Sequence, residues 1–153
     1  MTITFVCTGN ASRSPFAEAV MKKLLAENKL SGFEINSVGT KNLHNEPRNP
    51  EMVAVAKELG YTLNGVTRHI SEEDISKSDL ILIMSPKHYD KLTEILPKEC
   101  WGKIKLFNKY CFEDDTEVPD PYYQPDKAAY RQAADKIIAG CMCMIDRLKA
   151  NHN

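Results

Sequence analysis

The chain has 153 residues, with 20 Lys and Arg against 21 Asp and Glu, so its formal net charge is −1. A nearly balanced charge argues against a general binder of nucleic acid or of a membrane surface, and we expect neither as a partner. The cysteines number five, an odd count, and do not form two closely spaced pairs, which argues against a disulfide framework and a zinc site. The length suits one domain over residues 1–153, and the lack of a signal-peptide pattern or a long apolar stretch predicts a reducing, cytoplasmic location.

Strand and helix patterns alternate along the chain. Runs of apolar and β-branched residues predict strands over residues 2–7, 33–38, 80–84 and 103–107. Helical periodicity and capping signals predict helices over 14–27, 50–60, 86–96 and 126–149, with a short one after Ser71. This alternation predicts an α/β fold, a small doubly wound sheet of four parallel strands with helices on both faces, of the flavodoxin-like kind. Ligands of such folds bind at the carboxyl ends of the strands, where the strand order switches.

A short loop over residues 7–13 links the first strand to the first helix, which Ser14-Pro15 opens. Backbone N–H groups in a tight loop at a helix N-terminus bind oxyanions, and Arg13 adds a planar fork for two phosphate oxygens. The same positive surroundings favour the thiolate form of Cys7, and the thiolate is the nucleophile. The loop therefore predicts nucleophilic attack on a phosphoryl group.

The stretch from Phe5 to Pro15 resembles the phosphate-binding loop of low-molecular-weight protein tyrosine phosphatases. The sequence Asp120-Pro121-Tyr122-Tyr123 is similar to the general-acid loop of that family, and residues 37–40 and 79–84 fit its second and third strand regions. The resemblance covers nearly the whole chain. It implies hydrolysis of phosphotyrosyl proteins or small aryl phosphates through a cysteinyl-phosphate, with inorganic phosphate or a similar oxyanion held in the loop. It calls for no metal and no organic cofactor.

The resemblance also implies roles for the loop residues. Cys7 would attack phosphorus while the Arg13 guanidinium and the loop N–H groups hold the phosphate oxygens. Ser14 matches a serine that hydrogen-bonds the thiolate in the family, although an ordinary helix cap is an equally good interpretation. The other substrate-binding residues expected in the loop are Thr8, Gly9, Asn10, Ala11 and Ser12.

A second group of residues would complete the site from elsewhere in the chain. Asp120 is the expected general acid, which protonates the leaving group and then activates water. Taken alone, an Asp-Pro pair indicates only a turn. Tyr122 and Tyr123 are expected to line the mouth as an aromatic wall, with partial burial in the core as the other interpretation, and Leu43 stands where many relatives carry an aromatic residue.

Three positions depart from the family pattern. Ser12 replaces the second loop cysteine of many members, so oxidised Cys7 would have no resolving partner in its own loop. Gly65 stands where a histidine often precedes the arginine, and His69 lies in a different register and is not assigned that role. Ser85 replaces an aspartate after the third strand. The three groups that the reaction needs are nevertheless all present.

Two other functions compete with this interpretation. An arsenate reductase on the same scaffold would need relay cysteines, and here only Cys100 or Cys111 could serve, if one of them lies over Cys7. A non-catalytic phosphotyrosine-binding module would keep the cavity but has no need of a thiol and an acid together. A nucleotide-binding P-loop is excluded, because no Gly-Lys-Ser/Thr follows a glycine at the required interval.

Overall fold

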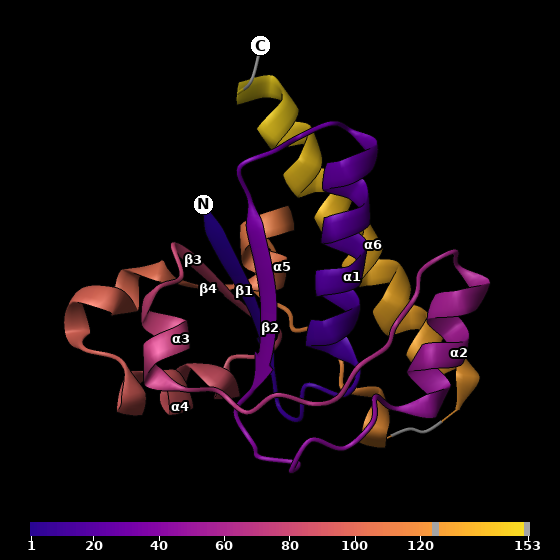
Figure 1. The fold of residues 1–153 in the computed structure, drawn as a ribbon, viewed down its shortest axis with the longest axis horizontal. Helices are drawn as coiled ribbons and strands as arrows, with labels where there is room; N and C mark the ends of the chain where they lie inside the picture. Colours follow the sequence, from indigo (N-terminus) through magenta and orange to yellow (C-terminus); the bar gives the residue numbers. More distant parts are fainter. Residues whose placement is uncertain (124–125, 152–153) are drawn as a thin grey trace.

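A computed structural model describes residues 1–123 and 126–151 (Figure 1). Strands and helices alternate along the chain as the sequence predicts. The strands are β1 (Thr2–Cys7), β2 (Glu34–Gly39), β3 (Leu80–Ile83) and β4 (Ile104–Leu106). The α-helices are α1 (Arg13–Glu27), α2 (Pro50–Glu58), α3 (Glu72–Ser76), α4 (Lys87–Ile95), α5 (Phe107–Phe112) and α6 (Lys127–Asn151), and the 3-10 helices are η1 (Lys98–Lys103) and η2 (Pro121–Tyr123).

The four strands form one parallel sheet in the order β2-β1-β3-β4, which confirms the predicted fold class. Helices α1, α2, α5 and α6 lie on one side of the sheet, and α3 and α4 lie on the other (Figure 1). Strand β1 pairs with β2 on one side and with β3 on the other. The strand order therefore switches at the carboxyl end of β1, where Cys7 stands, and this is where such folds bind ligands.

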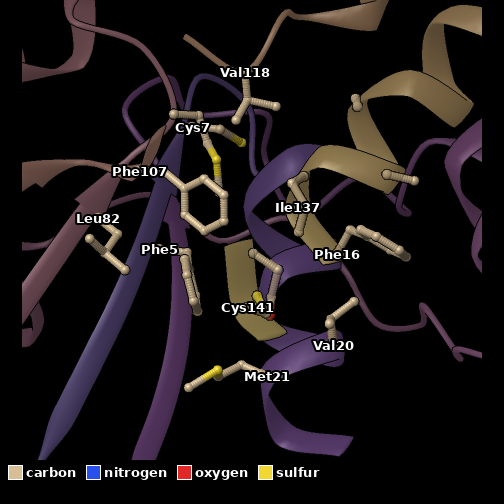
Figure 2. Packing of buried hydrophobic residues seen from close by; sticks show 14 of the residues in the cluster. Phe5, Cys7, Phe16, Val20, Met21, Leu82, Phe107, Val118, Ile137 and Cys141 are labelled. Carbon is tan, nitrogen blue, oxygen red and sulfur yellow. The ribbon is translucent and has the colours of Figure 1, made fainter. Parts of the chain in front are cut away.

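Side chains along β1 alternate between the two faces of the sheet. Ile3, Phe5 and Cys7 join the core cluster with α1 and α6, whereas Val6 joins the cluster on the opposite face. Figure 2 shows Phe5 and Cys7 on the same side as Phe107 and the α1 side chains. This alternation places the Cys7 thiol on the face that carries the N-terminus of α1.

Strand β3 is apolar at every position because both of its faces are covered. Leu80 and Leu82 contribute to the cluster with α1, and Ile81 and Ile83 contribute to the cluster with α3 and α4. A continuous apolar run is typical of a parallel strand between two helical layers. The sequence prediction for this segment is therefore confirmed, with the strand ending one residue earlier than expected.

The prediction is wrong at the end of the fourth strand. Phe107 is the first residue of α5 rather than the last residue of β4, and the sequence analysis missed this helix. The Phe107 ring is fully buried, and a Cβ added to Gly140 of α6 would lie only 2.4 Å from it. A glycine in a helix interior is unfavourable by itself, so it indicates close packing here.

The two predicted helix starts of the central region have the expected caps. The Asn49 side chain accepts a hydrogen bond from the backbone N–H of Met52 at 3.1 Å, and the Ser71 hydroxyl accepts one from the N–H of Asp74 at 3.2 Å. Within the described parts of the chain, none of the helices has the length and hydropathy needed to cross a bilayer.

Candidate active site

The loop after β1 makes a tight turn against the end of β2. Asn10 has a φ of 56°, in the left-handed region that asparagine tolerates better than most residues. A Cβ on Gly39 would lie 2.7 Å from the Thr8 carbonyl oxygen and 2.8 Å from the Asn10 nitrogen, so only glycine fits there. The backbone N–H of Thr40 donates to the Cys7 carbonyl at 3.0 Å. The loop is therefore braced by β2 as well as by its own sequence.

Cys7 lies at the base of the loop with its thiol against Ser14. The Sγ atom of Cys7 and the Oγ atom of Ser14 are 2.9 Å apart, and both residues are buried. The Asn10 amide donates to the Ser14 oxygen at 2.9 Å, so the Ser14 proton is left for another acceptor. The sulfur is closer than the alternative acceptor, the Val38 carbonyl at 3.4 Å. This geometry allows Ser14 to donate to a thiolate on Cys7.

Asn10 is the centre of a polar cluster behind the loop. Its side-chain amide donates to the Ser37 hydroxyl at 2.9 Å, and that hydroxyl donates to the Glu18 carboxylate at 2.6 Å. Its side-chain oxygen accepts from the Arg68 backbone N–H at 2.9 Å and from the Arg48 guanidinium at 2.6 Å. The buried side chain of Asn10 thus holds the shape of the loop and lies outside the lining of the cavity.

Arg48 occupies the space beside Gly65, where relatives often carry a histidine. Its Nη1 donates to both the backbone carbonyl and the side-chain oxygen of Asn10, and its Nε donates to the Asn64 carbonyl at 3.1 Å. Partial burial lowers the pKa of Arg48, and the nearby Glu18 carboxylate opposes that shift. The His69 side chain is exposed and lies outside the cavity lining. Arg48 lies in a segment without any motif, and the sequence did not predict its role in supporting the loop.

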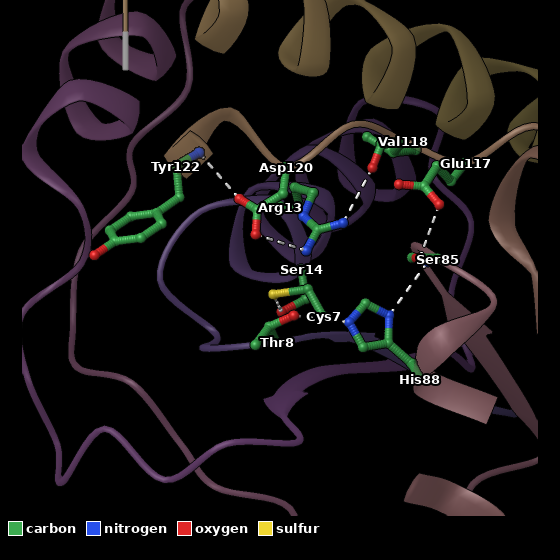
Figure 3. A network of polar contacts seen from close by, with 10 residues as sticks. All are labelled: Cys7, Thr8, Arg13, Ser14, Ser85, His88, Glu117, Val118, Asp120 and Tyr122. Atoms are coloured by element: carbon green, nitrogen blue, oxygen red, sulfur yellow. Dashed lines mark hydrogen bonds and ion pairs between the residues drawn. The ribbon is translucent and has the colours of Figure 1, made fainter. Parts of the chain in front are cut away.

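Arg13 connects the loop to the segment that carries Asp120. Only 2% of Arg13 is exposed, and its buried charge has two polar partners. The guanidinium donates to the Val118 carbonyl at 3.0 Å and lies 3.4 Å from the Asp120 carboxylate (Figure 3). The other Asp120 oxygen accepts from the Tyr122 backbone N–H at 3.1 Å. The structure therefore brings Asp120, which is far away in the sequence, to Arg13 and Cys7 of the loop.

These residues surround a cavity of about 250 Å³. Ten of the twelve predicted site residues line it, and the two others, Asn10 and Ser14, lie behind the loop. The predicted residues in the lining are Cys7, Thr8, Gly9, Ala11, Ser12, Arg13, Leu43, Asp120, Tyr122 and Tyr123. The lining also includes three residues that the sequence analysis missed, Lys41, Glu46 and Asn49.

The mouth of the cavity is aromatic. Tyr122 and Tyr123 are 71% and 72% exposed, which rules out the interpretation of partial core burial. Their rings meet edge to face with centroids 5.6 Å apart, and the Lys87 ammonium lies 5.8 Å from the centre of the Tyr123 ring. Leu43 faces the cavity from the other wall and touches the position that a Gly9 side chain would occupy.

A buried histidine also contacts the loop and was not predicted. His88 Nε2 lies 3.0 Å from the Thr8 hydroxyl, and the backbone N–H of Ser85 donates to His88 Nδ1 at 3.2 Å (Figure 3). The Ser85 hydroxyl donates to the Glu117 carboxylate at 3.0 Å. A carboxylate from the neighbouring loop therefore lies beside Ser85 at the carboxyl end of β3. His88 follows the carboxyl end of β3 by a few residues, and that position is the only sequence signal for it.

The fold and the site define a class of protein, a phosphatase that uses a cysteine. A thiol next to a hydroxyl donor, a buried guanidinium and a carboxylate around one small cavity are suited to phosphoryl transfer. The family model described as low molecular weight phosphotyrosine protein phosphatase matches residues 2–153. The chain belongs to this family.

Individual relatives agree with that assignment. A low molecular weight protein-tyrosine-phosphatase from Streptomyces coelicolor is 35% identical over 79% of this chain and 77% of its own length. Wzb from Vibrio vulnificus, solved with benzylphosphonate, has a TM-score of 0.84, 30% identity, and coverage of 95% of this chain and 97% of its own. The YwlE arginine phosphatase, solved as a C7S mutant with a phosphorylated active-site serine, has a TM-score of 0.86 and 27% identity, over 97% and 96% of the two chains.

Proposed function

We propose that residues 1–153 form one phosphatase domain that hydrolyses aryl phosphate monoesters, with phosphotyrosyl proteins as the natural substrate class. The observation that carries the proposal is the 2.9 Å contact between Ser14 and Cys7 at the base of a cavity that Arg13 and Asp120 close. The proposal requires a reducing compartment, because the reaction needs Cys7 as a free thiol.

In the first step, Cys7 Sγ attacks phosphorus in line with the ester oxygen. A sulfur–phosphorus bond forms and the bond to the ester oxygen breaks, which leaves a cysteinyl-phosphate on the enzyme. The Arg13 fork and the loop N–H groups stabilise the charge that spreads over the equatorial oxygens. The related YwlE arginine phosphatase, as a C7S mutant, carries a phosphorylated serine in its active site, which supports phosphoryl transfer to a side chain of the protein in this family.

Asp120 handles the proton in both steps. As an acid it protonates the departing phenolate oxygen, and as a base it then takes a proton from the water that hydrolyses the cysteinyl-phosphate. Its carboxylate is 18% exposed and is oriented by Arg13 on one oxygen and by the Tyr122 N–H on the other. This placement supports the role, because a general acid must reach the leaving group and also exchange its proton with solvent.

The walls of the cavity favour an aryl phosphate. Tyr122 and Tyr123 stand at the mouth while Cys7 lies at the base, so a long phenyl phosphate can reach the thiol and contact the rings together. A related Wzb binds benzylphosphonate, an aromatic phosphate analogue. Another relative is an arginine phosphatase, and Glu46 and Asp120 in this lining could accept a guanidinium, so phosphoarginine is the comparison that the experiment must include.

The arrangement of the cysteines speaks against an arsenate reductase. Cys100 packs against the core cluster on the face of the sheet opposite to Cys7. Burial raises the pKa of the Cys111 thiol to about 12, and it raises the pKa of Cys141 well above its usual value. All five cysteines are free, and a buried thiol with a raised pKa is a poor relay nucleophile.

The test is hydrolysis of p-nitrophenyl phosphate against pH in the presence of EDTA. The expected rate is bell-shaped in pH, is unaffected by the chelator, and is lost in both Cys7→Ser and Cys7→Ala. Phosphotyrosine, phosphoserine and phosphoarginine peptides then rank the substrate classes, and we expect phosphotyrosine to lead. Preference for phosphoarginine would overturn the aryl assignment, and turnover by Cys7→Ala would overturn the covalent mechanism.

A further inference from the structure

His88 is a buried polar side chain that the proposed reaction does not use. It lies in the first turn of α4, only 1% of the residue is exposed, and both of its ring nitrogens have partners. A buried polar group with well-defined partners on both sides specifies a geometry, because leaving either partner unpaired is costly. One of these partners, Thr8, lies directly after Cys7 and lines the cavity.

The contacts of His88 fix its tautomer. The Ser85 backbone N–H is only a donor, so Nδ1 must be the acceptor, and the proton of a neutral ring then sits on Nε2. Burial, together with the nearby cations Arg13 and Lys87, lowers the pKa of His88 to about 3, so the ring is neutral at physiological pH. His88 Nε2–H therefore donates to the Thr8 hydroxyl oxygen at 3.0 Å.

The consequence falls on the Thr8 hydroxyl. Its oxygen accepts from His88, so its own proton must point away from the ring. We infer that His88 is a positioning residue, which turns the Thr8 proton toward the cavity so that the hydroxyl becomes an additional donor to the bound phosphoryl group. This inference rests on the proposed function. It adds a side-chain donor beside the backbone N–H groups and Arg13, at a point where negative charge grows in the transition state.

The surroundings of His88 hold it in place. The Ser85 hydroxyl is tied to Glu117, and the same loop gives its Val118 carbonyl to Arg13 (Figure 3). His88 therefore sits between the phosphate-binding loop and the segment that leads to Asp120. A shift of either segment would change the distance between Nε2 and the Thr8 hydroxyl.

Two substitutions of His88 separate its two contacts. In His88→Gln the side-chain amide can reach the position of Nε2 and still donate to Thr8, whereas in His88→Asn it reaches only the position of Nδ1 near Ser85. We expect His88→Gln to keep kcat/KM for p-nitrophenyl phosphate within about threefold, and His88→Asn to lower it about tenfold. A purely structural role would reverse that order or make both variants equally slow, and either result overturns the inference.

A double-mutant cycle with Thr8 provides the second test. Thr8→Val should lower kcat/KM about tenfold, Thr8→Ser should leave it within about threefold, and adding His88→Asn to Thr8→Val should cost little more. If Thr8→Val is fully active, or if the two losses multiply to about a hundredfold, the inference fails. His69 is an exposed histidine on another segment, so His69→Gln is the matched control and should leave kcat/KM unchanged.

Binding of inorganic phosphate, measured by calorimetry, gives a readout that needs no turnover. Thr8→Val and His88→Asn should each weaken it about fivefold, while Thr8→Ser and His88→Gln should not. Unchanged phosphate affinity in Thr8→Val overturns the inference even if the chain hydrolyses no substrate. Failure of the proposed function would be seen in a separate assay, as the absence of Cys7-dependent hydrolysis by the unsubstituted protein.

Discussion

The base and the mouth of the cavity are built in different ways. At the base, Cys7, Asn10, Arg13 and Ser14 are each at most 3% exposed, and each has a specific polar partner. At the mouth, the rings of Tyr122 and Tyr123 stand largely in solvent, in edge-to-face contact with each other and with the Lys87 ammonium near the Tyr123 ring. The comparison indicates that the base sets the chemistry through preorganised donors, while the mouth contributes contact area to the substrate.

Among substitutions that keep the Cys7 thiol, the largest effect should come from Arg13→Lys, which keeps the charge at the base but removes the planar fork. Lysine cannot bind two phosphate oxygens and also reach the Val118 carbonyl and Asp120. We expect kcat/KM to fall roughly 10³-fold, with thermal unfolding checked by circular dichroism. Arg68→Lys is the control, because the Arg68 side chain forms an exposed ion pair with Asp74, while its contact with Asn10 is made by the backbone N–H and is kept in the variant. If Arg13→Lys were as active as that control, charge alone would suffice at the base.

Asp120 lies between the base and the mouth of the cavity, and Asp120→Asn tests its role as general acid. An asparagine has nearly the same shape, but its single acceptor oxygen can keep only one of the two contacts, with Arg13 or with the Tyr122 N–H, and it cannot act as a general acid. We expect a loss of about 10²-fold for aryl phosphates with poor leaving groups and a much smaller loss for p-nitrophenyl phosphate. A Brønsted plot over a series of substituted phenyl phosphates measures this difference. A loss that is equal across the series would contradict the acid role of Asp120.

Arg48→Met should destabilise the phosphate-binding loop at the base of the cavity, because Arg48 contacts Asn10 on the side of the loop away from the cavity. It keeps much of the aliphatic stem but removes the Arg48 donor to the Asn10 backbone carbonyl and side-chain oxygen. The side-chain oxygen keeps the Arg68 N–H, whereas the backbone carbonyl loses its Arg48 partner, and that loss is costly. We expect a loss of about 1–3 kcal/mol in the free energy of unfolding and about a tenfold loss in kcat. Urea unfolding and steady-state kinetics measure the two effects, and Arg68→Met is the matched control. Full activity at reduced stability would show that Arg48 supports the fold but not the reaction.

The sequence predicts those residues at the base of the cavity that lie close together along the chain, and it misses those that come from distant segments. Cys7, Arg13 and Ser14 lie within a single strand–loop–helix unit, so their type and spacing define the site locally. Arg48 and His88 reach the same loop from distant segments, and their contacts exist only after the sheet has formed. No local spacing marks such residues, because a lone arginine or histidine is compatible with many environments.

The fold follows the same rule. The parallel sheet and its covering helices were predicted, because apolar periodicity is repeated over many residues in each element. The boundary between β4 and α5 was missed, because both elements are short and Phe107 suits either. The Phe107 ring packs closely against Gly140 of α6, more than thirty residues later in the chain, and no local pattern around Phe107 reports that contact.

Lowering the pH should reduce the free energy of unfolding through His88, which contacts the phosphate-binding loop. Folded His88 has a pKa of about 3 against 6.5 for the free side chain, so between these values the unfolded chain binds a proton that the folded chain does not. The contribution of this group is complete above pH 6.5 and declines as the pH falls toward 3, by about 1.4 kcal/mol per pH unit. Urea unfolding between pH 7 and 5 should show this slope. His88→Gln should flatten it, and His69→Gln should not; equal slopes in both would contradict the assignment.

The smallest effect should come from the mouth, in Tyr122→Ala and Tyr123→Ala. Both rings are exposed, so their removal should change the free energy of unfolding by less than about 0.5 kcal/mol. KM for phosphotyrosine peptides should rise severalfold while kcat stays nearly constant, because the rings contact the ground state and the transition state alike. Inorganic phosphate, which does not reach the mouth, should bind as before, and this separates the mouth from the base. A loss of kcat equal to the rise in KM would show that the rings also help to position Asp120, because the Tyr122 backbone N–H, which remains in the alanine variant, would then have moved relative to the carboxylate.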